Sequence, residues 1–83
     1  MRNRATPDFW DCYNKLPAGI QRTADRKFEL FKKNPKHPSF NFHFVHGEDE
    51  RIARVKITRY YRAEAIVEGE TYTWFYIGPH DRH

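Results

Sequence analysis

A proline-rich segment at residues 34–38 divides the chain into two halves with different hydrophobic patterns. Proline has a fixed φ and no backbone N–H, so Pro35 and Pro38 together exclude both a helix and a central strand there. Before this segment, apolar residues recur every three to four positions, the period of a helix; after it, they alternate with polar residues, the period of a strand. The sequence therefore predicts an α+β fold, with helices first and strands second.

Two helices are expected before the prolines. Thr6 is a potential N-cap and Pro7 fits the first helical turn, which predicts a short helix over residues 7–13. Pro17 separates it from a longer helix over residues 17–33, because proline disfavours a helical conformation in the residue that precedes it. The apolar positions of the longer helix share one face, which should pack on the rest of the fold. They are Ile20, Ala24, Phe28 and Phe31.

The second half is expected to form an antiparallel sheet of about four strands. Polar turns separate the apolar stretches, and their short links pair neighbouring strands antiparallel in a meander. The two helices then pack on one face of the sheet. With 83 residues, the chain has room for one domain, spanning residues 1–83. The strands are expected at residues 41–46, 51–57, 61–67 and 72–77.

The chain is basic, with 15 Lys and Arg residues against 11 Asp and Glu residues and a formal net charge of +4. Such a charge favours nucleic acid or an acidic protein as a partner. The single cysteine, Cys12, cannot form an internal disulfide, and no Cys/His group has zinc spacing, so we expect neither a metal nor another cofactor. No stretch approaches the ~20 apolar residues of a membrane span, so we expect a cytoplasmic protein without a membrane partner.

Several common catalytic motifs are absent from the sequence. There is no Gly-rich phosphate loop, no His-Glu-x-x-His helix, and no serine or cysteine with an adjacent base. Ser39 is the only serine, and it follows Pro38 in an expected turn. Nucleotide hydrolysis, zinc proteolysis and triad chemistry therefore have no support.

The expected strands bring cations to one face of the sheet. In the strand at residues 51–57, apolar side chains alternate with Arg54 and Lys56, so both cations point outward, about 7 Å apart. On the next strand, Arg62 faces the same way and can join Lys56 across the sheet. Glu64 also lies on that face and could equally neutralise either neighbour. The pattern alone allows either a phosphate-sized cationic site or a solvated charged surface.

Four motifs between about Thr6 and Asp81 carry a family resemblance. They are Leu16-Pro17-x-x-Ile20-Gln21-Arg22-x-Ala24, Leu30-Phe31-Lys32-x-Asn34-Pro35-x-His37-Pro38-Ser39, Tyr61-Arg62-Ala63, and Trp74-Phe75-x-Ile77-Gly78-x-His80-Asp81. Their order and spacing resemble the RelE/ParE toxin superfamily of bacterial type II toxin–antitoxin systems. The resemblance implies a helical hairpin packed on an antiparallel sheet, and a cognate antitoxin as partner. RelE-like members cut mRNA in the ribosomal A site, whereas ParE-like members poison DNA gyrase.

The same resemblance implies roles for individual residues. Lys56 falls at the family's arginine on the strand before the Tyr-Arg motif, Arg62 is the arginine of that motif, and His80 lies closest to the terminal proton-transfer position. Lys56 and Arg62 would then bind the scissile phosphate and stabilise its growing charge, and His80 would serve as general acid or base. Arg54 and Lys32 would steer the RNA backbone. The expected function is that of a toxin acting as a ribosome-dependent mRNA endoribonuclease that inhibits translation.

Other functions remain open at this point. Lys56 replaces an arginine, and Arg82 and His83 occupy a tail where RelE-like members often have a tyrosine. The lysine favours a non-catalytic relative or a ParE-like toxin that binds DNA gyrase, whereas His80 favours the enzyme. A third possibility is a general RNA-binding domain that uses the basic sheet without cleaving RNA.

Overall fold

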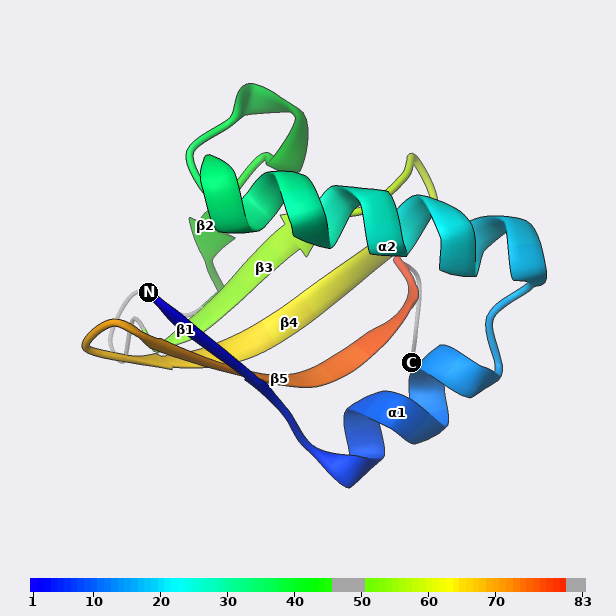
Figure 1. Ribbon diagram of the computed structural model, residues 1–83, viewed down its shortest axis with the longest axis horizontal. Coiled ribbons are helices and arrows are strands. Elements are labelled where there is room, and N and C mark those ends of the chain that lie inside the picture. The colour runs from blue at the N-terminus through cyan, green and yellow to red at the C-terminus, as the bar shows by residue number, and fades with distance from the viewer. Residues whose placement is uncertain (46–50, 81–83) are drawn as a thin grey trace.

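The computed structural model describes residues 1–45 and 51–80, which form two α-helices and a five-stranded mixed sheet (Figure 1). Helix α2 crosses one face of the sheet, and α1 packs against β5. The strand order is β1-β5-β4-β3-β2, with β1 parallel to β5 and the other neighbours antiparallel. The expected α+β class is confirmed. The elements are β1 (Arg2–Ala5), α1 (Pro7–Asn14), α2 (Ala18–Lys33), the 3-10 turn η1 (Pro38–Phe40), β2 (His43–Phe44), β3 (Ile52–Lys56), β4 (Tyr61–Glu68) and β5 (Thr71–Pro79).

Both helices begin at the signals in the sequence. Thr6 caps α1, because its hydroxyl oxygen accepts a hydrogen bond of 3.1 Å from the backbone N–H of Phe9. Pro17 occupies the N-cap position of α2, and that helix ends at Lys33, just before the proline-rich segment. Within the described residues, no helix is long and apolar enough to span a membrane.

The N-terminal strand β1 is the element that the sequence did not predict. Its four residues, Arg-Asn-Arg-Ala, are all exposed, so they carry no alternation of apolar and polar side chains. Pairing with β5 holds the strand in place, with Arg2 opposite Thr71 and Ala5 opposite Trp74. In addition, the indole N–H of Trp74 donates a 2.9 Å hydrogen bond to the side-chain oxygen of Asn3. The sheet therefore has five strands and is mixed, instead of about four that are all antiparallel.

The four C-terminal strands lie where they were expected, with different lengths. The strand predicted at residues 41–46 is reduced to β2, and position 46 lies outside the described residues, as does the turn expected after it. Strand β5 is longer than predicted and runs through Pro79. This extension carries the chain toward His80, whose backbone N–H donates a 2.6 Å hydrogen bond to the carbonyl of Tyr60.

The hydrophobic core lies between α2 and the sheet. Phe31 of α2 is 1% exposed, and its ring makes edge-to-face contacts of 5.3 Å between ring centroids with both Phe40 and Trp74. From β3, Ala53 and Val55 are buried against this core. Because side chains alternate along a strand, this burial directs the polar residues of β3 to the opposite face of the sheet.

Candidate functional site

A concave site lies on the face of the sheet opposite α2 and has a volume of about 330 Å³. Its lining includes four Lys and Arg side chains and two His side chains, but no Asp or Glu. This composition suits an anion, and no group of His, Cys, Asp and Glu within residues 1–45 and 51–80 could hold a metal ion. We call this surface the cationic site. It is lined by Asn41, His43, Arg54, Lys56, Thr58, Arg59, Tyr61, Arg62 and His80.

The strand register explains why the cations meet. Lys56 of β3 lies directly opposite Arg62 of β4, which in turn lies opposite Gly78 of β5. Directly opposed residues project from the same face of a sheet, so Lys56 and Arg62 are side by side. His80 follows two residues after Gly78 and lines the same concavity. The next row of opposed residues on the same face, two residues along the strands, is His43, Arg54, Glu64 and Tyr76.

Glu64 lies beneath the cationic site and contacts two of its arginines. Its side chain is 3% exposed, and Oε2 accepts a 3.0 Å hydrogen bond from Nε of Arg54. The same oxygen lies 3.4 Å from Nε of Arg62, an ion pair without hydrogen-bond geometry, so this Nε is buried with no hydrogen-bond partner among the described residues. One carboxylate therefore positions two guanidinium groups and offsets part of their charge, without neutralising the site.

Because Gly78 has no side chain, it leaves room on the face of β5 beside Arg62 for the ring of Tyr76. A Cβ atom at Gly78 would overlap the phenol ring of Tyr76. The hydroxyl of Tyr76 donates a 3.2 Å hydrogen bond to the carbonyl of Pro79, which holds the ring over the glycine. Tyr76 thus covers β5 beside the paired Lys56 and Arg62.

His43 lines the cationic site but was not among the residues expected there. It pairs directly with Arg54, and its Nδ1 lies 2.8 Å from the carbonyl oxygen of Asn41. Asn41 has a φ of 46°, a left-handed conformation that Asn adopts more readily than most residues. The sequence contained a signal for His43, because it alternates with Phe42 and Phe44 and therefore lies on the face opposite theirs.

Lys32 is not part of the cationic site, although RNA contact was expected for it. It lies on α2, on the other side of the sheet, and its Nζ is 2.9 Å from Oε2 of Glu29. The hydrogen bond and the positive charge from Lys32 hold the pKa of Glu29 below its usual value. Among the expected site residues, the structure therefore brings Arg54, Lys56, Arg62 and His80 together and leaves Lys32 apart.

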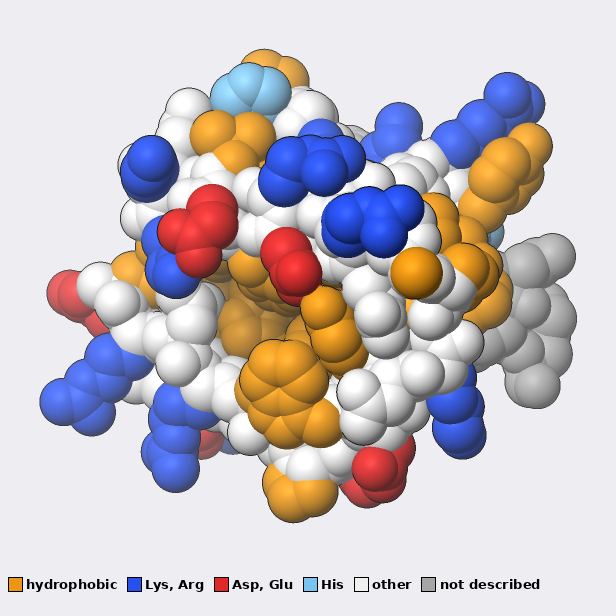
Figure 2. Space-filling model, turned by 45° about the vertical axis from the view of Figure 1, so that its right-hand side comes forward, with side chains coloured by type: hydrophobic (Ala, Val, Ile, Leu, Met, Phe, Trp, Pro, Cys, Tyr) orange, Lys and Arg blue, Asp and Glu red, His pale blue; other side chains and the backbone are white. Residues whose placement is uncertain are grey.

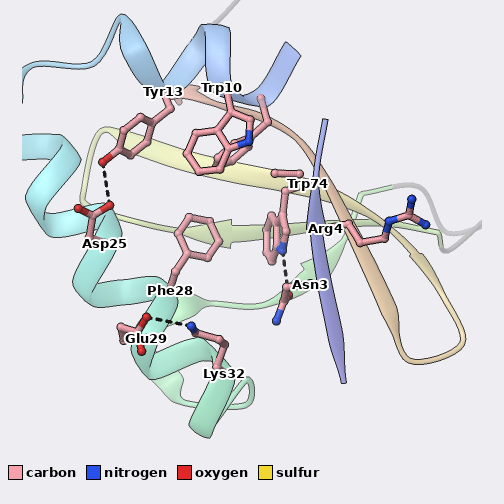
Figure 3. Close-up of a pocket in the computed structure, with 11 residues that line it drawn as sticks. Asn3, Arg4, Trp10, Tyr13, Asp25, Phe28, Glu29, Lys32 and Trp74 are labelled. Carbon is pink, nitrogen blue, oxygen red and sulfur yellow. Dashed lines mark hydrogen bonds and ion pairs between the residues drawn. The ribbon is translucent and has the colours of Figure 1, made fainter. Parts of the chain in front are cut away.

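Lys32 belongs instead to the rim of an apolar groove of about 480 Å³ between α1, α2 and β1 (Figure 3). Figure 2 shows this groove as a hollow of hydrophobic side chains with charged side chains along one rim. At one end, the hydroxyl of Tyr13 donates a 2.8 Å hydrogen bond to Asp25 and so joins α1 to α2. Burial, followed by the hydrogen bond and the charge of Asp25, raises the pKa of Tyr13. The aromatic residues that line the groove are Phe9, Trp10, Tyr13, Phe28 and Trp74.

A separate polar cluster surrounds Ser39 in η1. Its Oγ lies 2.9 Å from Nδ1 of His37 and 3.1 Å from Nζ of Lys27. The expectation that no serine has an adjacent base is therefore wrong, because the turn after Pro38 folds Ser39 back onto His37. The same Nδ1 accepts the backbone N–H of Ser39 at 3.1 Å and thereby caps η1. These contacts give the cluster a structural role, because they connect η1 to α2.

No protein-family model and no curated protein matches the chain. Solved structures do match, over almost its whole length. The YoeB/ParE toxin from Agrobacterium tumefaciens superposes with a TM-score of 0.74 at 17% identity, covering 98% of this chain and 100% of the other. YafQ from E. coli strain BL21(DE3) gives a TM-score of 0.76 at 8% identity, covering 96% and 94%. A chain of the intact E. coli RelBE toxin–antitoxin complex gives 0.68 at 14% identity, covering 98% of each. The chain therefore has the fold of the RelE/ParE toxins.

Proposed function

We propose that the protein is the toxin of a type II toxin–antitoxin system and acts as a ribosome-dependent mRNA endoribonuclease that inhibits translation. The observation that carries this proposal is the pairing of Lys56 with Arg62 in a concave cationic site, with His80 beside them. The shared fold with RelE/ParE toxins adds support, because the site lies in a domain of that architecture.

The reaction would be cleavage of RNA by its own 2′-hydroxyl. The 2′-oxygen attacks the adjacent phosphorus, a P–O2′ bond forms and the P–O5′ bond breaks, which leaves a 2′,3′-cyclic phosphate and a 5′-hydroxyl. Arg62 binds the phosphate through its planar guanidinium, and Lys56 contributes a point charge that stabilises the transition state. His80 transfers a proton, because a histidine side chain can act as a general acid or base.

Other residues of the cationic site would hold the RNA around the scissile phosphate. Arg54 and Arg59 line the same concavity and would attract neighbouring phosphates. Glu64 keeps Arg54 and Arg62 oriented through its buried carboxylate. Lys32 lies on the other side of the sheet, so the RNA-binding part of the proposal rests on Arg54 and Arg59.

The partner in this proposal is an antitoxin with an amphipathic, acidic segment. The apolar groove offers aromatic side chains to such a segment, including Trp10, which is 50% exposed. Acidic residues elsewhere in the antitoxin would complement the net charge of +4 and cover the cationic site. One of the matching folds comes from a toxin–antitoxin complex, which agrees with a partner of this kind.

A second candidate function is toxicity through protein binding alone, either by a non-catalytic relative or by a ParE-like toxin directed at DNA gyrase. Two observations favour it. Glu64 offsets part of the arginine charge in the cationic site, and the apolar groove presents an exposed aromatic surface. A protein partner would use the groove, whereas RNA would use the cationic site.

The test is to induce the protein in bacteria and to map mRNA 5′ ends across the transcriptome. We expect cuts at fixed positions within codons, and their loss in Arg62→Ala and in His80→Ala. Arg22→Ala, which removes an exposed arginine from α2, is the matched control and should cut like the wild type. Intact mRNA with induction of the DNA-damage response would favour gyrase, and unaffected growth would contradict both toxin functions.

A further inference from the structure

We propose that His43 is a second catalytic residue of the cationic site and acts as the general base, which makes His80 the general acid. This inference rests on the proposed function, since it assigns the two proton transfers of that reaction. Three features of the structure support it: the position of His43 across the sheet, the hydrogen bond that fixes its ring, and the absence of another task for its second nitrogen among the described contacts.

The two histidines come from the ends of strands on either side of the two that carry the phosphate-binding cations. His43 is on β2, Lys56 on β3, Arg62 on β4, and His80 follows β5, in the order of the strands across the sheet. Three strand spacings, about 14 Å, separate β2 from β5. In-line displacement places the attacking and leaving oxygens on opposite sides of the phosphorus, so the base and the acid must also lie on opposite sides. A phosphate on Lys56 and Arg62 would have a histidine-bearing strand on each side, and both histidines line the same concavity.

The hydrogen bond to Asn41 determines which nitrogen of His43 is available. A carbonyl oxygen can only accept, so the 2.8 Å contact requires Nδ1 of His43 to carry the proton. In the neutral ring, Nε2 then has a free lone pair and can accept a proton. The left-handed backbone of Asn41 aims its carbonyl at the ring, so the base and its orienting group lie two residues apart.

With this assignment, both protons that the reaction transfers have a donor and an acceptor. Nε2 of His43 takes the proton from the 2′-hydroxyl as the P–O2′ bond forms. His80, in its protonated form, donates a proton to the 5′-oxygen as the P–O5′ bond breaks. The protein ends with His43 protonated and His80 neutral, and exchange with solvent restores both.

His37 provides a matched control, because it is a histidine that caps η1 and lies outside the cationic site. Its Nδ1 accepts the backbone N–H of Ser39 and caps η1, and His37 does not line the cationic site. Both His37 and His43 can be replaced by Gln, which keeps a polar side chain of similar length. Circular dichroism and thermal unfolding of each variant separate a loss of fold from a loss of catalysis.

The first experiment measures single-turnover cleavage of ribosome-bound mRNA as a function of pH. We expect His43→Gln to lower the rate by about 100-fold or more and to lose the acidic limb of the profile, which reports a group that must be neutral. The His37→Gln variant should keep the wild-type rate and the acidic limb of the profile. A His43→Gln variant with the wild-type rate and profile would overturn the inference while leaving the endoribonuclease intact; a wild-type protein that cuts nothing would overturn both.

Other charged or titratable groups near His43 also bear on the pH profile. They are Arg54, Lys56, Arg59, Tyr61, Arg62, Glu64 and His80.

The second experiment separates base from acid by changing the leaving group. A substrate with sulfur in place of the 5′-oxygen needs no general acid, because a thiolate leaves without protonation. We expect this substrate to restore the rate of His80→Gln toward that of the wild type and to leave His43→Gln slow. Restoration of His43→Gln alone would contradict the assignment.

The tautomer of His43 can be determined without an activity assay. Nitrogen NMR of the free protein should show the neutral ring of His43 protonated at Nδ1, as the contact with Asn41 requires. A ring protonated at Nε2 would overturn the proposed base, since no lone pair would then be available on that nitrogen.

Discussion

The cationic site and the apolar groove lie on opposite faces of one sheet and differ in how their charges are balanced. In the groove, Asp25 accepts a hydrogen bond from Tyr13, and Glu29 pairs with Lys32, so each rim carboxylate has a local partner. In the cationic site, four Lys and Arg side chains line the concavity and the buried carboxylate of Glu64 lies beneath them. Both surfaces contain charged residues, but only the cationic site retains an excess of one sign. The cationic site therefore suits a polyanion, and the apolar groove suits an apolar protein segment.

Arg62→Ala should have the largest effect, because it removes the guanidinium nearest the proposed scissile phosphate. We expect cleavage of ribosome-bound mRNA to slow by about 100-fold to 1,000-fold. Single-turnover kinetics give this rate. Lys32→Ala is the matched test on the groove and should leave the rate unchanged; equal losses in the two variants would remove the distinction between the two surfaces.

Glu64→Gln tests whether the buried carboxylate is structural. It removes the charge that faces Arg54 and Arg62, of which Arg62 is only 8% exposed. Breaking a buried pair leaves uncompensated charge, so we expect about 3 kcal/mol of destabilisation in chemical unfolding. Glu29→Gln, an exposed carboxylate on the groove rim, should leave the unfolding midpoint essentially unchanged. A stable Glu64→Gln protein would show that the arginines do not depend on this contact.

Trp10→Ala tests the groove. Exposed aromatic side chains that fill a partner's pocket often dominate a protein interface, so the loss should weaken antitoxin binding by about 2 kcal/mol. Calorimetric titration with the purified antitoxin measures this change. The rate of mRNA cleavage by the free protein should not change, and slower cleavage by this variant would link the groove to the chemistry.

Tyr13→Phe should have the smallest effect. It removes the hydrogen bond to Asp25 at an exposed position, for which we expect less than about 1 kcal/mol. The pKa of Tyr13 is raised in the folded protein, so this stabilisation is fully present below the unfolded pKa of about 10 and is lost as the pH rises through the folded value. Unfolding of both proteins at several alkaline pH values checks the sign, and a difference that grows with pH would contradict it.

Residues with a local signal could be predicted from the sequence. Thr6 and Pro17 defined the starts of the two helices, and alternation around Val55 placed Arg54 and Lys56 on the outer face of β3. Features that depend on contacts distant in sequence could not be predicted. Strand β1 has no pattern of its own and is held by β5, while the assignment of Lys32 required knowing which face of the sheet α2 covers.

The contacts of Glu64 also show what the sequence could not predict. Its place on the same face as Arg54 and Arg62 followed from alternation, but its contact with both arginines depends on how three side chains share a buried space. His43 was missed for a different reason: the alternation with Phe42 and Phe44 was present, but only the strand register showed that His43 lies directly opposite Arg54.

The most direct test of the proposed endoribonuclease is the chemistry of the cut ends. Purified protein would be incubated with ribosomes carrying a defined mRNA codon in the A site, and the fragments analysed by mass spectrometry. Attack by the 2′-hydroxyl predicts a 2′,3′-cyclic phosphate on the upstream fragment and a 5′-hydroxyl on the downstream fragment. Intact mRNA, or fragments with a 5′-phosphate, would contradict the role of Lys56, Arg62 and the flanking histidines.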